Sequence, residues 1–294
     1  MSAFHVIMNP AARSRRAGAL KEAVEALDPR PVMHYTTAAG HATEIARELV
    51  QSGVKLVIAA GGDGTMNETL QGVCRANAER AEGEAPAAMG TLPLGTMNVF
   101  AAEMGLPGRD LRACWQRITS GERREVDLWM ANDLYFVQLG GVGLDAEVIR
   151  QTTWEDKMRF GPLSYALSAL RVLRQPETVL TVHIEGRPPI PSSLVLIGNG
   201  RRYGGPLPVF RQASNSDGLL DILVFHHVDC AEIGDLVRSA AHLGDGPPEG
   251  VQHFQLERFE VRCERDAAFE LDGELAGVCP VRFAPASQRL IVAG

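Results

Sequence analysis

Residues 58–68 read Ile58-Ala59-Ala60-Gly61-Gly62-Asp63-Gly64-Thr65-Met66-Asn67-Glu68, and this stretch decides the fold. It ends an apolar run, Val54–Ala60, that is interrupted only by Lys55, as is typical of a parallel strand covered on both faces. The glycines that follow allow the backbone to turn tightly and to approach a ligand without a Cβ. Thr65 and Glu68 fit a capping box, which predicts a helix start with exposed amides just after the loop. The stretch therefore predicts either a strand–loop–helix anion site or an ordinary turn at that junction.

Lysine is scarce in this chain, and the glycine loop contains none. The 294 residues include 29 Lys and Arg, of which only Lys21, Lys55 and Lys157 are lysines. A P-loop would carry a lysine, so phosphate here would be held mainly by backbone amides, with arginine for side-chain contacts. The formal net charge of −7 disfavours a polyanionic partner, and we expect no binding of nucleic acid.

The N-terminal half alternates expected strands with expected helices. Helices are predicted up to about Leu27, over His41–Gln51, and from the glycine loop to about Glu79. The predicted strands are Phe4–Met8, Val32–Tyr35, Val54–Ala60 and Ala87–Leu94. This order is typical of a parallel sheet with right-handed crossovers, in which ligands bind where strands end and helices begin.

A second glycine-bearing loop, Pro93–Phe100, follows the fourth expected strand. Loops that follow neighbouring parallel strands converge on one edge of the sheet, so this loop and the first are expected to meet. Taken alone, the second loop is an ordinary turn with Thr96 as a helix N-cap.

From about Arg123 the pattern changes to short strands separated by turn pairs such as Asp217-Gly218, which predicts a mainly antiparallel half. Helical segments are expected at Leu163–Arg174 and Cys230–Leu243. The predicted strands are Arg124–Met130, Leu134–Leu139, Val179–Glu185, Ser193–Ile197, Leu219–Phe225, Gln255–Cys263 and Ala268–Leu271.

Acidic residues stand at two of these turns. Asp272 and Glu274 flank Gly273 at an expected hairpin tip, where one carboxylate can act as a general base and the other can orient it, or where both belong to a solvated turn. Asp217 can contribute to a site for a hard cation, or to a plain turn. Asp127 and Asp145, each taken alone, are interpreted as structural or surface acids.

The remaining patterns favour a cytoplasmic protein without a transmembrane segment. The five cysteines form no C-x-x-C pair, which gives no sign of a disulfide framework or a zinc module. The N-terminal residues lack the basic region of a signal peptide. Residues 85–102 are uncharged but contain Pro86, Gly90, Pro93 and Gly95, which makes a spanning helix a poor interpretation.

The ordered set of motifs resembles the diacylglycerol kinase catalytic-domain family, which includes bacterial lipid kinases and the sphingosine and ceramide kinases. The first glycine loop also occurs in NAD kinases and phosphofructokinases, so the later motifs distinguish the family. In order, the motifs are Asn9-Pro10, Thr36 four residues before Gly40, Gly61–Thr65, Pro93–Asn98, Asp217-Gly218 and Asp272–Glu274.

The resemblance implies an α/β plus β architecture with two domains. A Rossmann-like α/β nucleotide-binding domain would span residues 1–125 and 286–294, and an antiparallel β-sandwich domain for the lipid substrate would span residues 126–285. The active site would lie in the cleft between them. The resemblance also implies that the final strand, near Arg289–Ala293, returns to the first domain.

The resemblance further implies roles for individual residues. Asp272 and Glu274 would act as a unit that accepts the proton of the lipid hydroxyl, and Asp63 would act through the catalytic metal or its waters. Asp127 and Asn98 would belong to the metal and water network or to the substrate site. The residues implied to hold Mg²⁺ are Ser214, Asp217 and Leu219. Those implied to hold ATP are Asn9, Thr36, Gly61, Gly62, Asp63, Gly64, Thr65, Met66, Asn67 and Thr96.

The function implied is an ATP-dependent and Mg²⁺-dependent lipid kinase that meets its lipid substrate by peripheral contact at a membrane surface, with a homodimer as a further option. One residue departs from the pattern, because Val99 stands where many bacterial members have Asp. Two alternatives stay open: a kinase of the NAD kinase type with a soluble substrate, and a non-catalytic protein that binds lipid or nucleotide.

Overall fold

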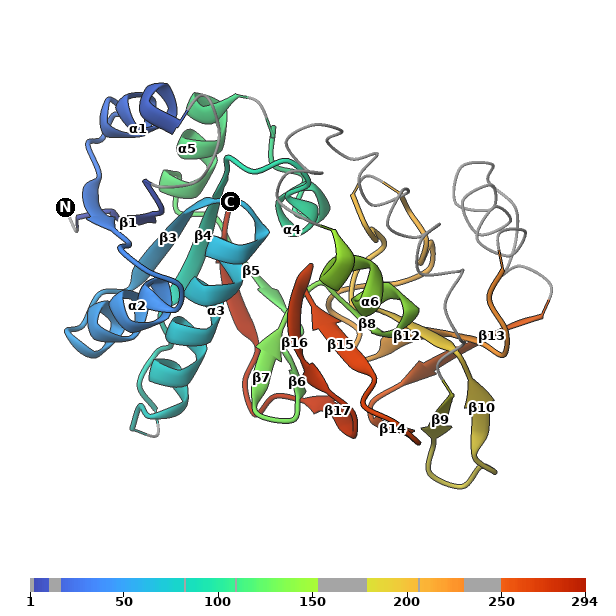
Figure 1. Ribbon diagram of the computed structural model, residues 1–294. Helices are drawn as coiled ribbons and strands as arrows, with labels where there is room; N and C mark the ends of the chain where they lie inside the picture. The colour runs from blue at the N-terminus through green and yellow to red at the C-terminus, as the bar shows by residue number, and fades with distance from the viewer. Residues whose placement is uncertain are drawn as a thin grey trace. The chain divides into compact units, whose positions relative to one another are not determined.

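The computed structural model describes residues 3–10, 17–81, 83–108, 110–152, 179–205, 207–229 and 250–294. The chain divides into two compact units, which are coloured along the chain in Figure 1. Unit 1 comprises Met1–Leu128 and Ser287–Gly294, and unit 2 comprises Trp129–Ala286. The helices expected at Leu163–Arg174 and Cys230–Leu243 lie outside the described residues.

Unit 1 contains a six-stranded sheet whose neighbouring strands β2, β1, β3 and β4 are all parallel, which confirms the predicted parallel sheet. The order β2-β1-β3-β4 differs from the 3-2-1-4-5-6 order of Rossmann domains. The expectation of a Rossmann-like domain is therefore confirmed only to the extent that unit 1 has parallel strands in an α/β arrangement. The strands in spatial order are β2 (Val32–Tyr35), β1 (His5–Met8), β3 (Leu56–Gly61), β4 (Ala88–Pro93), β18 (Leu290–Ala293) and β5 (Arg123–Val126).

Helices cover both faces of this sheet (Figure 1). Val57 of β3 packs with residues of α2 and α3, while the adjacent Ile58 points to the opposite face, toward Ile118 of α5. A Cβ on Gly72 of α3 would lie 2.3 Å from the carbonyl oxygen of Thr43, so α2 and α3 approach closely only because this residue is glycine. The helices are α1 (Ala17–Glu25), α2 (His41–Gln51), α3 (Asp63–Ala78), α4 (Val99–Glu103) and α5 (Leu111–Thr119).

The last strand of the chain completes the sheet of unit 1. β18 pairs with β4 in parallel and with β5 in antiparallel orientation, so the expected return of the final strand to the first unit is confirmed. Leu290 and Val292 are each 1% exposed. Burial of these side chains holds the C-terminal segment in the core of the sheet.

Unit 2 is a sandwich of two six-stranded sheets in which every paired strand is antiparallel. One sheet has the order β10 (Ile190–Ser192), β9 (Leu180–His183), β14 (Phe259–Cys263), β17 (Val281–Pro285), β6 (Trp129–Ala131) and β7 (Leu134–Phe136). The other has the order β13 (Val251–Leu256), β12 (Leu220–Phe225), β11 (Leu194–Gly198), β8 (Leu139–Gly143), β15 (Ala268–Leu271) and β16 (Glu274–Val278).

The core of unit 2 lies between these sheets. Trp129, Phe136 and Phe283 of the first sheet belong to the same buried cluster as Val195 and Ile222 of the second. The inward side chains therefore alternate along each strand, as in other sandwiches. α6 (Leu144–Gln151) follows β8 and packs against β15.

Three predicted strands of the second half are wrong in extent. Arg124–Met130 is divided between β5 and β6, which belong to different sheets, and Gln255–Cys263 is divided between β13 and β14. The prediction Leu134–Leu139 stops at Phe136, and the glycine-rich β8 begins at its last residue. Glycine weakens the sequence signal of a strand, but in β8 it allows close contact: a Cβ on Gly141 would lie 2.5 Å from Asp145 Oδ2.

Candidate functional site

The carboxyl ends of the parallel strands place four loop starts at one edge of the sheet in unit 1. Met8 is in register with Tyr35 and with Ala60, and Gly61 is in register with Pro93. The next residues along the chain are therefore neighbours at this edge, among them the half-buried Asn9, the buried Thr36 and the two glycine loops. This is the edge at which open α/β sheets bind ligands.

The two glycine loops touch, as their positions on neighbouring strands predicted. The amide of Leu94 donates to the carbonyl oxygen of Gly61 at 2.9 Å. A Cβ on Gly95 would lie 2.5 Å from the Cα of Gly62, which is closer than two such atoms can approach. Glycine at position 95 is thus required for the contact between the loops.

Asp63 joins the two loops with its carboxylate. Oδ2 accepts from the amide of Asn98 and Oδ1 from the amide of Val99, both at 3.0 Å. These amides begin α4, so Asp63 caps a helix that follows the other loop. The interpretation of Thr96 as the N-cap is wrong: Thr96 is exposed in the loop, and Asn98 occupies the cap position with a φ of 48°.

The capping box predicted for Thr65 and Glu68 is also wrong. Helix α3 already begins at Asp63, so Thr65 lies within its first turn. The carboxylate of Glu68 instead accepts from the amides of Gly40 at 2.8 Å and Ala42 at 3.1 Å, at the start of α2. Glu68 thus caps the start of α2, where backbone amides lack partners within the helix, instead of the start of its own helix α3.

Asp63→Ala is expected to lower stability. Loss of the two amide contacts should reduce the free energy of unfolding by about 1–2 kcal/mol, measured by urea denaturation. Asp110→Ala is the matched control, because Asp110 caps α5 through a 2.9 Å hydrogen bond from the amide of Ala113. The control should lose comparable stability. An Asp63→Ala variant as stable as the wild type would contradict the capping role of its carboxylate.

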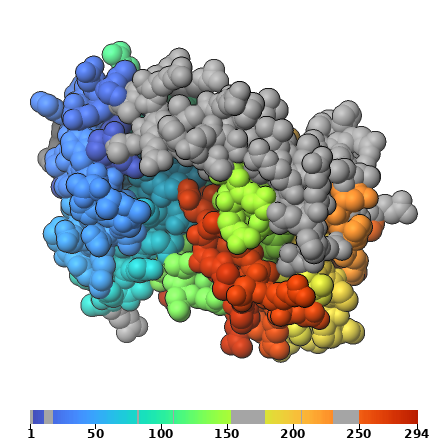
Figure 2. Space-filling view, viewed as in Figure 1, coloured from blue at the N-terminus to red at the C-terminus, as the bar shows by residue number. Residues whose placement is uncertain are grey.

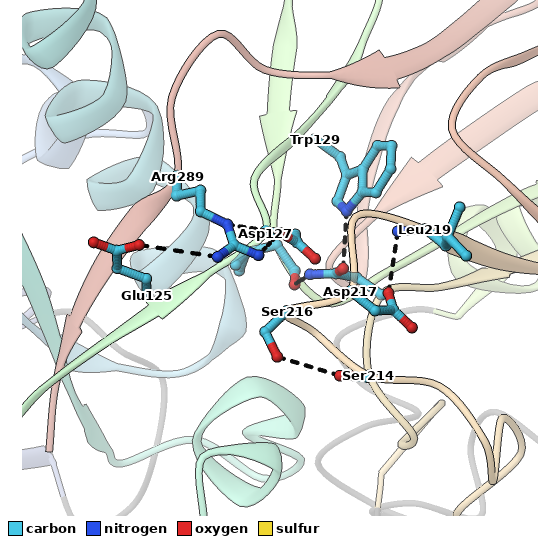
Figure 3. A network of polar contacts seen from close by, with 10 residues as sticks. Glu125, Asp127, Trp129, Ser214, Ser216, Asp217, Leu219 and Arg289 are labelled. Atoms are coloured by element: carbon cyan, nitrogen blue, oxygen red, sulfur yellow. Dashed lines mark hydrogen bonds and ion pairs between the residues drawn. The ribbon is translucent and has the colours of Figure 1, made fainter.

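Asp127, in unit 1, is 6% exposed and pairs with a residue of the C-terminal segment. Arg289 donates to Asp127 Oδ1 through Nε at 2.9 Å and through Nη2 at 2.5 Å, and its Nη1 lies 3.9 Å from Glu125 Oε2 (Figure 3). The guanidinium balances the buried charge of Asp127.

The residues implied to hold Mg²⁺ lie in unit 2 on the segment before β12. Asp217 Oδ1 accepts from the amide of Leu219 at 3.1 Å, and the hydroxyl oxygens of Ser214 and Ser216 are 3.3 Å apart (Figure 3). A hydroxyl, a carboxylate and backbone carbonyls are hard oxygen donors of the kind that Mg²⁺ prefers. Within the described part of the chain, no three His, Cys, Asp or Glu side chains gather as a metal cluster.

Asp272 lies in the tight turn between β15 and β16. Its φ is 51° and that of Gly273 is 88°, the pair of positive values that a two-residue type I′ turn requires. The side chain is not solvated: Asp272 is 4% exposed, whereas Glu274 is exposed. Its Oδ1 accepts from the amides of Gln138 at 2.9 Å and Leu139 at 3.1 Å, and its Oδ2 from that of Val137 at 3.1 Å. A fixed, charged acceptor is thus built into the turn.

A second acidic group near this turn was missed by the sequence interpretation. The hydroxyl oxygen of Tyr203 lies 2.8 Å from Asp145 Oδ2 and 3.2 Å from Glu270 Oε1. Burial raises the pKa of Glu270 well above its usual range, and the charge of Asp145 raises it further. Burial also raises the pKa values of Asp145 and Tyr203. Glu270 alternates with the core residues Phe269 and Leu271, so it lies on the other face of β15, two residues before Asp272, and this alternation was the one available signal.

The chain thus combines an α/β unit that has two touching glycine loops with an antiparallel sandwich that carries a buried Asp in an Asp-Gly-Glu turn. The chain belongs to the diacylglycerol kinase family of lipid kinases: residues 3–131 match the diacylglycerol kinase catalytic domain, and residues 140–293 match the YegS C-terminal NAD kinase beta sandwich-like domain.

Relatives agree with this assignment, and a solved structure shares the fold. The diacylglycerol kinase of Bacillus subtilis (strain 168) is 28% identical over 257 residues, which cover 85% of this chain and 81% of the relative. A Chromohalobacter salexigens protein named "Probable lipid kinase YegS-like" is 31% identical over 247 residues, 82% of this chain and 76% of its own. A crystal structure of a diacylglycerol kinase from Bacillus anthracis shares the fold, with a TM-score of 0.75 over 99% of this chain and 96% of that chain, at 24% identity.

Proposed function

We propose that this protein is a kinase that transfers the γ-phosphate of ATP to a hydroxyl group of a diacylglycerol-like or sphingoid lipid. The observation that carries the proposal is Asp272, a buried carboxylate held by three backbone amides in a chain of the lipid kinase family. A lipid alcohol has a pKa far above 7, so its attack on phosphorus needs a positioned acceptor for the proton.

The glycine loops of unit 1 support nucleotide binding. The start of α3, where Gly62 is the N-cap, presents backbone amides and the positive end of the helix dipole toward a phosphate. No lysine is needed for this arrangement, in agreement with its absence from the loop. The residues proposed to hold ATP are Asn9, Thr36, Gly61, Gly62, Asp63, Gly64, Thr65, Met66, Asn67 and Thr96.

The acidic residues of unit 2 support the chemistry at the acceptor. As the lipid oxygen bonds to the γ-phosphorus, the bond from that phosphorus to the bridging oxygen breaks and ADP leaves. The hydroxyl proton passes to the carboxylates of Asp272 and Glu274, which we propose to act as a unit. Asp63, Asn98 and Asp127 are proposed to hold the reacting groups or their waters, with Val99 in place of a further acid.

The oxygen donors of Ser214, Asp217 and Leu219 fit Mg²⁺, and we propose that they hold it. Asp217 is exposed, and its Oδ1 accepts from the Leu219 amide at 3.1 Å, which fixes the carboxylate on the short turn that also carries the Leu219 carbonyl. When bound, Mg²⁺ would offset negative charge on phosphate oxygens.

Contact with the lipid is proposed to be peripheral, at the membrane surface of the cytoplasm. Among the described residues, no helix has the length and apolar character needed to cross a membrane. A lipid acceptor would then be reached from the aqueous side of the bilayer.

The proposal is tested by incubating the protein with radiolabelled ATP, Mg²⁺ and mixed micelles that contain one candidate lipid at a time. The panel comprises diacylglycerol, monoacylglycerol, phosphatidylglycerol, sphingosine and ceramide. We expect label in at least one lipid, and none when Mg²⁺ is withheld. A panel without any labelled lipid would overturn the proposal.

A soluble acceptor is the second candidate, and it is favoured by one observation: residues 140–293 match a domain described as NAD kinase beta sandwich-like. Labelled NADP formed from NAD, without any labelled lipid, would assign this activity instead. Binding of ATP or lipid without transfer to any acceptor would identify a non-catalytic member.

A further inference from the structure

A cluster of three ionisable side chains lies beside the Asp272 turn within unit 2. Glu270 is on β15 and has no exposed surface, Tyr203 is 8% exposed, and the half-buried Asp145 is in the first turn of α6. Figure 2 shows α6, in yellow-green, directly against the red C-terminal strands, in agreement with the contacts between α6 and β15. Gly141 leaves the space for this cluster, since its Cβ would lie 2.5 Å from Asp145 Oδ2 and 2.7 Å from the Tyr203 hydroxyl oxygen.

The proton count favours one neutral acid in this arrangement. The Tyr203 oxygen lies within 3.2 Å of Asp145 Oδ2, Glu270 Oε1 and the carbonyl oxygen of Gly140, at 2.8, 3.2 and 3.1 Å. A phenol has one proton to donate, so two of these three contacts would otherwise join oxygens without a hydrogen between them. A proton on one carboxyl group turns a repulsive contact into a hydrogen bond that Tyr203 accepts.

The surroundings favour Glu270 as the holder of that proton. Glu270 is completely buried and close to the charge of Asp272, whereas Asp145 lies in the first turn of a helix, where a negative charge is stabilised. The other charged side chains of α6, Glu147 and Arg150, pair with each other at 2.6 Å. On the adjacent β16, Glu274 is exposed.

We propose that Glu270 is protonated at neutral pH and acts as a positioning residue for the Asp272–Gly273 turn. In this arrangement Glu270 donates to Tyr203, and Tyr203 donates to the ionised Asp145. The other oxygen of Glu270, Oε2, accepts from the amide of Gly273 at 2.9 Å. A neutral acid thereby fixes the turn without placing a second buried negative charge next to Asp272.

Infrared difference spectroscopy of Glu270→Gln tests the proton directly. Glutamine has the shape and the hydrogen bonds of the protonated acid, since its amide can donate to Tyr203 and its oxygen can accept from Gly273. At neutral pH, the spectrum of the wild type minus that of Glu270→Gln should contain a positive carboxylic acid carbonyl band. The Asp145→Asn variant should keep this band. Loss of an ionised carboxylate band from Glu270→Gln would overturn the proposal.

The pH dependence of unfolding gives a second test that needs no activity. The folded protein keeps a proton that the unfolded chain releases above about pH 4.3, so for this group unfolding becomes more favourable as the pH rises. Its contribution to the unfolding equilibrium constant rises by up to about tenfold per pH unit until the pKa of the folded state is reached. Glu270→Gln lacks this contribution and should gain stability relative to wild type as the pH rises. Parallel curves for the two proteins would contradict the proposal.

The positioning role rests on the proposed function and has its own measurement. Glu270→Gln should keep the kcat of the wild type for lipid phosphorylation, while Glu270→Ala, which lacks the contact to Gly273, should lose about 10²-fold in kcat. A loss in Glu270→Gln as large as that in Glu270→Ala would refute the positioning role. If the wild type phosphorylates no acceptor, the proposed function fails, while the infrared and unfolding results still decide the protonation of Glu270.

Discussion

Asp272→Asn is expected to lower kcat for lipid phosphorylation by about 10²- to 10⁴-fold, the range supplied by a positioned general base. The variant removes the proton acceptor, and it also places an NH₂ group where one carboxylate oxygen accepts an amide. Because Oδ1 accepts from Gln138 and Leu139 and Oδ2 from Val137, asparagine can satisfy one side of this arrangement only. We therefore also expect a loss of about 1–3 kcal/mol in the free energy of unfolding.

Two measurements separate these effects. ATP affinity, determined by calorimetry at a temperature at which the variant is folded, should remain close to that of the wild type. Glu274→Gln is the control for stability alone, because Glu274 belongs to the proposed acceptor unit but is exposed at the same turn, and its unfolding free energy should change little. Full kcat in folded Asp272→Asn would remove Asp272 from the proposed chemistry, and loss of ATP binding would contradict its assignment to the acceptor.

Gly95→Ala is expected to separate the two glycine loops and to weaken ATP binding by about tenfold or more. The added Cβ would lie 2.5 Å from the Cα of Gly62 and 2.8 Å from Asn98 Oδ1, and the first of these is a backbone atom that cannot rotate away. Overpacking of this kind should also cost about 1–3 kcal/mol of stability. Equilibrium binding of ATP and urea denaturation measure the two losses.

Gly108→Ala provides the control for this substitution. Gly108 is exposed, has no atom within 4 Å of its Cβ position and does not have a positive φ. The control should keep the affinity and stability of the wild type. An ATP affinity of Gly95→Ala equal to that of Gly108→Ala would show that contact between the loops does not matter for the nucleotide.

Elements with a strong local pattern were predictable from the sequence. The predicted bounds of Val32–Tyr35, His41–Gln51 and Ala268–Leu271 coincide with those of β2, α2 and β15. The bounds of β8 were not predicted because three of its five residues are glycine, and its position depends on pairing with β11 and β15. The division of Gln255–Cys263 into two strands likewise reflects pairing in two different sheets. β13 pairs with β12, whereas β14 pairs with β9 and β17, and no local pattern encodes these pairings.

Features of the site that depend on the sequence of a single loop or on strand order were predictable. Contacts between side chains far apart in the sequence were not. Contact between the glycine loops follows from strand order alone, and the Asp-Gly turn of Asp272 follows from its sequence. The partner of Glu68 lies 28 residues away at Gly40, and Tyr203 lies 67 residues from Glu270. Such pairings arise from tertiary packing. The sequence therefore assigned Glu68 to the wrong helix start and gave Asp145 no partner.

The position of β18 constrains the order in which the two units can fold during synthesis. β5 pairs with β18, and β18 separates β5 from β4, so the sheet of unit 1 is incomplete until residues 290–293 have been synthesised. Unit 2 lies entirely between these segments in the chain. During translation, the sandwich can therefore finish folding first, while the earlier-made part of unit 1 keeps an unpaired strand edge until residues 290–293 are available.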